Sequence, residues 1–277
     1  MASTTDLFWR MVLEQEVKII VMITHLFEAG KVKCDQYWPE SGSAQFGDIT
    51  VTTVREDILA FYTLRTFTVS RLGSPAQQKR KGKGEPVVEG GTVYQYHYTA
   101  WPDHGVPLHA LPLISFVRNS AAANPEPDSP VLVHCSAGVG RTGCYIVIHA
   151  MLQQIIARGD LDVFSFLQHI RTQRNGLVQT EEQYAFIHDA LVEAIEAGET
   201  HITKSCLPKY IHSLQCIDVT DEKPNPHKVL EKQYKVKMSN ITWLGGLRSG
   251  NCIPVCFAAC VRLPCGQDPV QHGAADL

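Results

Sequence analysis

The chain has 277 residues, a net charge of −3 and 44% hydrophobic residues, enough for one globular core or two small ones. The nearly balanced charge excludes the strongly basic surface typical of nucleic-acid-binding proteins. The longest apolar run, residues 19–24, is far shorter than the roughly 20 residues of a membrane-spanning helix, and the first ten residues lack a signal-peptide pattern. We therefore expect neither a nucleic-acid partner nor a membrane span in this chain.

The cysteines indicate a reducing compartment. Their number, nine, is odd, and Cys34, Cys135 and Cys144 lie inside strongly patterned segments. Thiols in such positions are typical of a core in a cytosolic protein rather than of a disulfide framework. We therefore expect a cytoplasmic location.

Strand patterns dominate the first hundred residues. A buried strand is predicted over residues 18–24, and strands of period two over residues 48–54, 61–69 and 92–99. The segment between the last two, residues 71–91, is rich in Gly, Pro and Lys, which predicts an exposed hairpin excursion between antiparallel neighbours. Its basic run KRKGKG is more typical of a solvated loop than of an anion-binding site.

Three helices are predicted from apolar residues at helical spacing, over residues 144–155, 163–170 and 184–195. Thr180 and Gln183 are spaced as a capping box for the third helix, and Gly198 is placed to end it. Together with a further buried strand at residues 131–133, these elements predict an α/β fold in which a sheet packs between helices.

The pattern weakens beyond residue 200. Residues 201–237 are predicted to form a linker, with short helices in KSCLPKYIHSLQC and LEKQYK. Residues 238–277 show neither helical nor strand periodicity, and we expect this cysteine-containing tail to be disordered or non-native. Its four cysteines are separated by four, four and five positions, which fits no zinc-binding pattern, so no metal site is predicted.

The stretch VLVHCSAGVGRTG, residues 131–143, places a cysteine between a predicted strand and a predicted helix. Backbone N–H groups at a helix N-terminus form a natural anion site, and Gly138 and Gly140 allow the turn to curl so that these groups converge. Arg141 adds donors matched to phosphate oxygens, and the same positive field favours a thiolate at Cys135. A small buried cysteine before a glycine turn is the simpler interpretation of such a segment taken alone.

The motif HCSAGVGRTG resembles the active-site loop of protein tyrosine phosphatases. The resemblance implies that Cys135 is the nucleophile, that Arg141 binds phosphate, that Thr142 stabilises the departing thiolate and that His134 tunes the cysteine. It also implies the family's fold, a mixed and highly twisted central sheet flanked by helices. The backbone that would cradle the phosphate belongs to Ser136, Ala137, Gly138, Val139 and Gly140.

Transfer of a phosphoryl group to a thiolate needs an acid that protonates the departing tyrosine oxygen. WPDHGVP, residues 101–107, carries a candidate, although Pro-Asp-His-Gly is on its own a common turn. Beside the cysteine motif it resembles the closing loop of the same family. By that resemblance Asp103 is both general acid and general base, and Trp101 serves closure of the loop.

The second step, hydrolysis of a phosphocysteine, needs a positioned water. VQTEEQYAF, residues 178–186, is similar to the family's glutamine loop, which implies that Gln179 positions this water and that Gln183 gives supporting contacts, in addition to or instead of capping the helix. In FEAGKVKCDQYWP, the resemblance implies that Glu28 orients Arg141 and that Lys33 faces the substrate.

The resemblance covers about residues 6–198 and is closest to the first catalytic domain of receptor-type enzymes of the gamma and zeta subgroup, which sit on the cytoplasmic side of the plasma membrane. It implies a hydrolase without metal or cofactor that dephosphorylates phosphotyrosine-containing proteins in signal transduction. The family's domain normally begins earlier, with a phosphotyrosine-recognition loop for which this chain shows no counterpart. We therefore expect an incomplete catalytic domain over residues 1–200, lacking its N-terminal segment. A weakly active or inactive phosphotyrosine-binding module and an unstable fragment are the alternatives.

Overall fold

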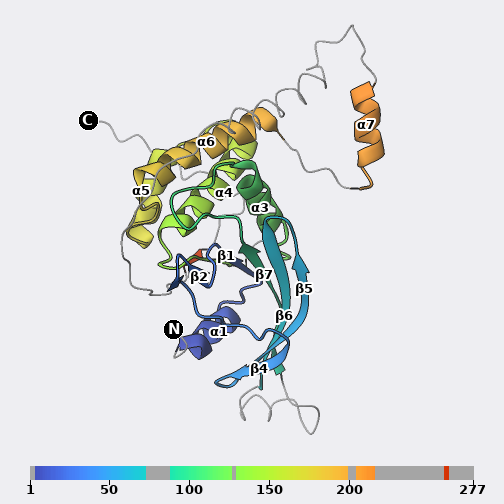
Figure 1. Cartoon of the computed structure of the whole chain (residues 1–277), viewed down its shortest axis with the longest axis vertical. Helices are drawn as coiled ribbons and strands as arrows, with labels where there is room; N and C mark the ends of the chain where they lie inside the picture. The colour runs from blue at the N-terminus through green and yellow to red at the C-terminus, as the bar shows by residue number, and fades with distance from the viewer. Residues whose placement is uncertain (1–3, 73–87, 127–128, 199–203, 216–258, 262–277) are drawn as a thin grey trace, which may run out of the picture.

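The computed structural model describes residues 4–72, 88–126, 129–198, 204–215 and 259–261 (Figure 1). Its centre is a mixed sheet of seven strands in the order β4-β5-β6-β7-β1-β8-β9. Strand β1 runs parallel to its neighbours β7 and β8, and all other neighbours are antiparallel. In chain order the strands of this sheet are β1 (Ile19–Met22), β4 (Gly42–Phe46), β5 (Ile49–Ile58), β6 (Tyr62–Leu72), β7 (Val88–Tyr98), β8 (Val131–His134) and β9 (Ala259–Val261).

Helices cover both faces of the sheet (Figure 1). Helix α1 (Thr5–Glu14) lies on one face, and α3 (Leu111–Ala122), α4 (Gly140–Arg158), α5 (Val163–Gln173) and α6 (Glu181–Ala197) gather on the other. Helix α7 (Leu207–Gln215) follows α6 in the chain, and β2 (Phe27–Glu28) with β3 (Lys31–Val32) forms a separate hairpin. No helix in the described stretches is long and apolar enough to cross a bilayer.

The alternation of side chains along β1 explains the two cores. Ile19 and Val21 point into the cluster shared with α3, α4, α5 and α6, whereas Ile20 and Met22 point into the cluster shared with Trp9 and Val12 of α1. All of these side chains are fully or almost fully buried. A strand covered on both faces reads as an unbroken apolar run, which is the pattern of residues 19–23.

The predicted α/β architecture, a mixed sheet flanked by helices, is confirmed. Each strand and helix predicted between residues 18 and 198 is present, with boundaries shifted by a few residues. Strands β6 and β7 are antiparallel neighbours, as the hairpin prediction requires, although residues 73–87 between them lie outside the described residues. Gly198 ends α6 with a φ of 64°, and α7 confirms the helix predicted in KSCLPKYIHSLQC.

Sequence periodicity did not predict α1, α3 or the short strands β2, β3 and β4. Helix α1 has ten residues, and α3, which begins beside Pro112, has twelve. Helices this short gain most of their stability from burial of one face, here Trp9 in α1 and Phe116 in α3.

Three residues of the C-terminal tail form β9, which pairs antiparallel with β8. No periodicity in the sequence predicted this strand. Residues 216–258 and 262–277, including LEKQYK, lie outside the described residues. The linker and tail assignments therefore stay predictions.

Candidate active site

The cysteine loop, residues 135–139, joins β8 to α4. His134 ends β8, and its carbonyl accepts a hydrogen bond from Ile23 N–H (2.9 Å) that extends the pairing of β8 with β1. Gly138 has a φ of 68°, a left-handed conformation that favours glycine, and α4 begins two residues later with 19 residues. The loop thus lies at the N-terminus of a long helix, where unpaired N–H groups and the helix dipole favour an anion.

Cys135 is buried, with 5% of its surface exposed, and its neighbours fix its position. Thr142 Oγ1 donates a hydrogen bond to Cys135 Sγ (3.2 Å) from the first turn of α4. A hydroxyl donor in this position stabilises a sulfur that carries negative charge. Cys135 and Cys144 carry thiols rather than disulfides, as predicted.

A buried chain of hydrogen bonds supports the cysteine from behind. Gln95 Nε2 donates to the hydroxyl of Tyr37 (2.7 Å), which bonds His134 Nε2 (2.8 Å), while His134 Nδ1 bonds the carbonyl of Cys135 (3.1 Å). The tautomer with its proton on Nδ1 satisfies both contacts of the imidazole. The contacts place His134 where the sequence analysis expected it and add Tyr37 and Gln95 as partners.

Arg141 and Glu28 form a buried two-pronged ion pair, with Nη1 to Oε1 at 2.6 Å and Nη2 to Oε2 at 2.8 Å. Glu28 also accepts hydrogen bonds from His25 N–H and Thr24 Oγ1. Burial alone would raise the pKa of Glu28, but the ion pair and these hydrogen bonds together lower it. The carboxylate therefore holds both Nη atoms of the guanidinium, and the orienting role expected for Glu28 stays a prediction.

The acid loop, residues 101–107, meets the same guanidinium. Arg141 Nη2 donates to the carbonyl of Pro102 (3.2 Å), and the guanidinium lies 5.6 Å from the ring centroid of Trp101. Trp101 is buried, packs edge-on against Phe186 of α6 and donates from Nε1 to the carbonyl of Gly105 (3.1 Å). Arg141 therefore links the cysteine loop to the acid loop.

Asp103 is exposed at the tip of the acid loop. Its Oδ2 accepts a hydrogen bond from the backbone N–H of Ala29 (2.8 Å), in the turn between β2 and β3. Ala29 has a φ of 48°, a conformation uncommon for residues other than glycine. The β2-β3 hairpin thus contributes Glu28 to the arginine and Ala29 to the candidate acid.

The glutamine segment, residues 177–183, packs against the start of α4. A Cβ added to Gly143 would lie 2.3 Å from the backbone nitrogen of Val178, and one added to Gly140 would lie 2.9 Å from the amide of Gln183 and 3.4 Å from that of Gln179. The close approach of the backbone requires a glycine at position 143, whereas at position 140 the glutamine side chains could shift. The two glutamine side chains therefore lie close to Gly140 at the start of α4, and the roles expected for them stay predictions.

Thr180 caps α6 as predicted, because its Oγ1 accepts a hydrogen bond from Gln183 N–H (3.1 Å). The side chain of Gln183, however, accepts from the N–H of Gln179 (2.8 Å) and not from that of the capping residue. Only half of the capping box is thus present, and the other half holds Gln179 in place. This contact agrees with the supporting role predicted for Gln183.

Val178 has a φ of 59°, which is strained for a β-branched residue. Arg171 of α5 compensates by donating to the carbonyls of Leu177 (2.8 Å) and Val178 (2.7 Å), and Val178 N–H bonds the carbonyl of Val139 (3.1 Å). Strain held in this way beside a binding loop is typical of functional sites.

The remaining predicted residues lie at the rim of the cysteine loop. Ser136 Oγ donates to the backbone carbonyl of Lys33 (2.8 Å), so this contact of Lys33 is made through its main chain. The carbonyl of Ala137 accepts from Arg174 (3.3 Å). Among the residues that the structure describes, no group of three or more His, Cys, Asp or Glu side chains is arranged to hold a metal ion.

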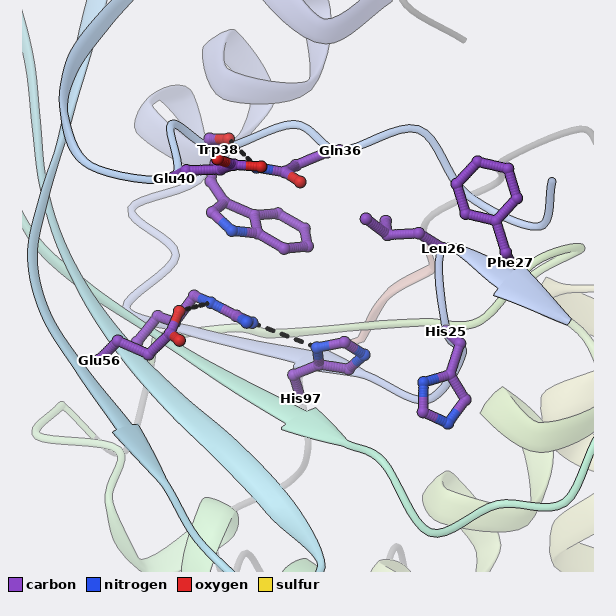
Figure 2. A pocket seen from close by; sticks show the side chains of 9 residues that line it. His25, Leu26, Phe27, Gln36, Trp38, Glu40, Glu56 and His97 are labelled. Atoms are coloured by element: carbon purple, nitrogen blue, oxygen red, sulfur yellow. Dashed lines mark hydrogen bonds and ion pairs between the residues drawn. The ribbon is translucent and has the colours of Figure 1, made fainter.

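A cavity of about 540 Å³ opens beside the Glu28 segment (Figure 2). Trp38 and His97, which make a T-shaped contact with ring centroids 6.2 Å apart, line it together with His25 and Phe27. Arg65 lies over the Trp38 ring and bonds both Glu56 and His97. Burial lowers the pKa of His97 to about 4, so its imidazole is neutral near pH 7.

The sequence analysis missed Ala29, Tyr37, Gln95 and Arg171. Ala29 acts through its backbone and carries no sequence signal. Gln95 lies in a predicted strand, Tyr37 lies in a segment for which no strand or helix was predicted, and Arg171 lies on a helix face that reads as solvent-exposed. The sequence analysis also gave no role to Arg174, which donates a hydrogen bond to the carbonyl of Ala137.

Comparisons with known proteins identify the family. A profile described as protein-tyrosine phosphatase matches residues 1–193. The chain is 51% identical over 251 residues to the putative receptor-type tyrosine-protein phosphatase mosPTP-1 of Aedes aegypti. The aligned region covers 91% of this chain and 18% of that relative. It is 50% identical to tyrosine-protein phosphatase 99A of Drosophila melanogaster, over 84% of this chain and 16% of that one. It is also 50% identical to human receptor-type tyrosine-protein phosphatase zeta, over 86% of this chain and 10% of that relative.

The chain therefore belongs to the protein-tyrosine phosphatase family, and the predicted resemblance to receptor-type members is confirmed. It spans less than a fifth of the length of these relatives.

Proposed function

We propose that this chain hydrolyses phosphotyrosine in proteins through a phosphocysteine intermediate at Cys135. The observation that carries the proposal is the convergence of three separate segments on one anion site: the cysteine loop, the Glu28–Arg141 ion pair and the acid loop. Membership of the family supports the same reaction class. The proposal includes a reducing compartment, since the nucleophile must remain a thiol.

In the first step, the Cys135 thiolate attacks phosphorus in line with the tyrosine oxygen. The N–H groups of residues 136–140 and the guanidinium of Arg141 hold the phosphoryl oxygens as charge develops on them. The P–O bond to tyrosine breaks, and Asp103, in its protonated form, delivers a proton to the departing oxygen. A new S–P bond joins phosphate to the enzyme.

In the second step, a water held by the Gln179 amide attacks the phosphocysteine. The Asp103 carboxylate left by the first step accepts a proton from this water, and the S–P bond breaks. The sulfur departs as a thiolate that accepts the hydrogen bond from Thr142 Oγ1. The close packing of Gln179 and Gln183 against Gly140 supports this assignment.

The direct test is release of phosphate from a phosphotyrosine peptide by the purified chain in EDTA, beside its Cys135→Ser variant. We expect turnover by the parent chain and none above background by the variant, with the same melting temperature for both. A folded parent chain that binds the peptide without turnover would favour the alternative of a phosphotyrosine-binding module.

A further inference from the structure

The cavity of about 540 Å³ beside the Glu28 segment takes no part in the proposed chemistry (Figure 2). None of the described residues that line it belongs to the cysteine loop, the acid loop or the glutamine segment. Its volume lies within the usual range for pockets that hold small organic molecules. We call it the Trp38 cavity, after the indole ring that forms part of its wall.

The apolar part of the Trp38 cavity consists of two rings and a leucine. Trp38 is only 6% exposed, because Tyr37 and His97 make T-shaped contacts with its ring. Leu26 and Phe27 complete this part of the wall, and Phe27 is 67% exposed. The cavity therefore offers an apolar surface that can bury the ring of a ligand.

The one cation among the described residues of the wall is already neutralised. Arg65 Nε pairs with Glu56 Oε2 at 2.6 Å, and its side chain is 12% exposed. Its Nη1 donates to the side chains of Gln95 (3.0 Å) and His97 (3.2 Å), and the guanidinium lies 4.7 Å from the ring centroid of Trp38. An anionic ligand would have to compete with Glu56 for this arginine.

Glu40 is the charge that remains without a partner. It lines the cavity and makes no hydrogen bond or ion pair within the part of the chain that the structure describes. Gln36 Nε2 donates to the carbonyl of Trp38 (3.0 Å), which leaves the amide oxygen of Gln36 to accept from a ligand. A carboxylate and an amide oxygen beside an apolar wall favour a ligand that carries N–H donors and a positive charge.

The wall of the Trp38 cavity is also the segment that holds the partner of Arg141. His25 N–H and Thr24 Oγ1 both donate to the Glu28 carboxylate. The imidazole of His97 donates to the carbonyl of Thr24 (2.8 Å), and that of His25 donates to the carbonyl of Thr99 (3.0 Å). A ligand in this cavity would thus lie against residues 24–28 without touching the cysteine loop.

We propose that the Trp38 cavity binds a small organic cation, an ammonium group carried by an aromatic ring. The ammonium pairs with the Glu40 carboxylate and donates to Gln36 Oε1, and the ring packs against Trp38 and Leu26. The inference does not depend on the proposed function, because the site shares no residue with the cysteine loop or the acid loop.

The binding test compares three probes of similar size by calorimetric titration at pH 7. Phenethylamine carries a positive charge, 2-phenylethanol carries none and phenylacetate carries a negative charge. Phenethylamine should bind the parent chain at least about threefold more tightly than the alcohol, as expected for an ion pair near the surface, and phenylacetate should bind most weakly. No binding of the amine, or equal affinities for the amine and the alcohol, would overturn the inference.

Matched variants assign the charge that is recognised. Glu40→Gln keeps an acceptor oxygen but removes the charge, and it should lower the affinity for phenethylamine to that for 2-phenylethanol. Asp189→Asn is the control, because it removes an exposed carboxylate that lines a different cavity on α6 and should leave both affinities unchanged. An unchanged affinity in Glu40→Gln, or an equal loss in both variants, would count against the proposed site.

Inorganic phosphate and hydrogen exchange locate the bound amine. At constant ionic strength, phenethylamine should still bind the phosphate-saturated chain, and it should slow amide exchange in residues 24–28 and 36–40 but not in residues 135–143. Displacement by phosphate, or protection confined to the cysteine loop, would overturn the inference. None of these readouts needs turnover, so an inactive but folded parent would count against the proposed function alone.

Discussion

The cysteine loop and the acid loop carry the two halves of the proposed chemistry, and the fold holds them by different means. The cysteine loop is fixed from within: it lies between a fully buried strand and the buried first turns of α4, and His134, Thr142 and Glu28 behind it are almost completely inaccessible. The acid loop is held by a few contacts, made by Trp101, the carbonyl of Pro102 and the Asp103 carboxylate. Asp103 itself is exposed.

This difference teaches that the binding half of the site depends on the stability of the core, whereas the proton-transfer half depends on a small number of polar contacts. Substitutions in the first should therefore change folding and binding together. Substitutions in the second should change rate while the fold and affinity persist.

The largest effect is expected at the tip of the acid loop. Asp103→Ala should lower kcat by about 10²–10⁴, the usual contribution of a general acid, because no other acid is placed to protonate the leaving oxygen. Its melting temperature and its affinity for a phosphotyrosine peptide should match those of the parent, since the side chain is exposed and Arg141 is untouched. A fall in affinity as large as the fall in rate would contradict the proposal that the cysteine loop binds phosphate and the acid loop transfers the proton.

The next largest effect is expected at the buried ion pair. Glu28→Ala leaves the Arg141 guanidinium without its partner and should lower the free energy of unfolding by about 3–5 kcal/mol. Binding of phosphate or vanadate should weaken as well, because the guanidinium loses its fixed plane. Urea unfolding and a binding titration measure the two effects.

Glu28→Gln is the matched control, since it keeps an acceptor oxygen for Arg141 and should lose less of both stability and binding. Loss of binding in Glu28→Ala without any loss of stability would show that the cysteine loop does not depend on the core in the way described.

The smallest effect is expected at His149, a buried histidine in α4. His149 of α4 is buried against Tyr145, and its Nδ1 has no hydrogen-bond partner among the residues that the structure describes. Burial lowers the pKa of His149 from 6.5 to about 4. The unfolded chain takes up a proton below pH 6.5 that the folded chain resists until about pH 4, so stability falls as the pH decreases through this range. This group alone should remove about 2 kcal/mol of stability between pH 7.5 and pH 5.

His149→Phe should abolish that part of the pH dependence, keep the aromatic contact with Tyr145 and stabilise the protein at pH 5. Urea unfolding at the two pH values is the measurement. The same slope in both proteins would show that His149 is not responsible.

Much of this arrangement could be predicted from the sequence, because strands β1, β5, β6, β7 and β8, helices α4, α5 and α6 and the two loop motifs are encoded locally. The buried run of residues 19–23 and the sequence HCSAGVGRTG each specify their structure over a few neighbouring positions. Helices α1 and α3 could not be predicted in this way, since their short patterns depend on what they pack against.

The missed site residues share a physical reason. Ala29 contacts Asp103 across 74 positions of the chain and does so through its backbone, which every residue possesses. Arg171 reads as a solvent-facing cation on an amphipathic helix, and only the fold shows that it donates to the carbonyls of Leu177 and Val178. Tertiary contacts of this kind leave no pattern in a single sequence.

The central claim is that catalysis passes through a covalent phosphocysteine. The most direct measurement is an acid quench during turnover of 4-nitrophenyl phosphate by the parent chain and by Gln179→Ala, followed by peptide mapping with mass spectrometry. The account predicts a phosphoryl group on the peptide that contains Cys135, at higher occupancy in the variant, where the water for the second step is no longer positioned. Continued release of product with no phosphoryl group on that peptide in either protein would contradict it.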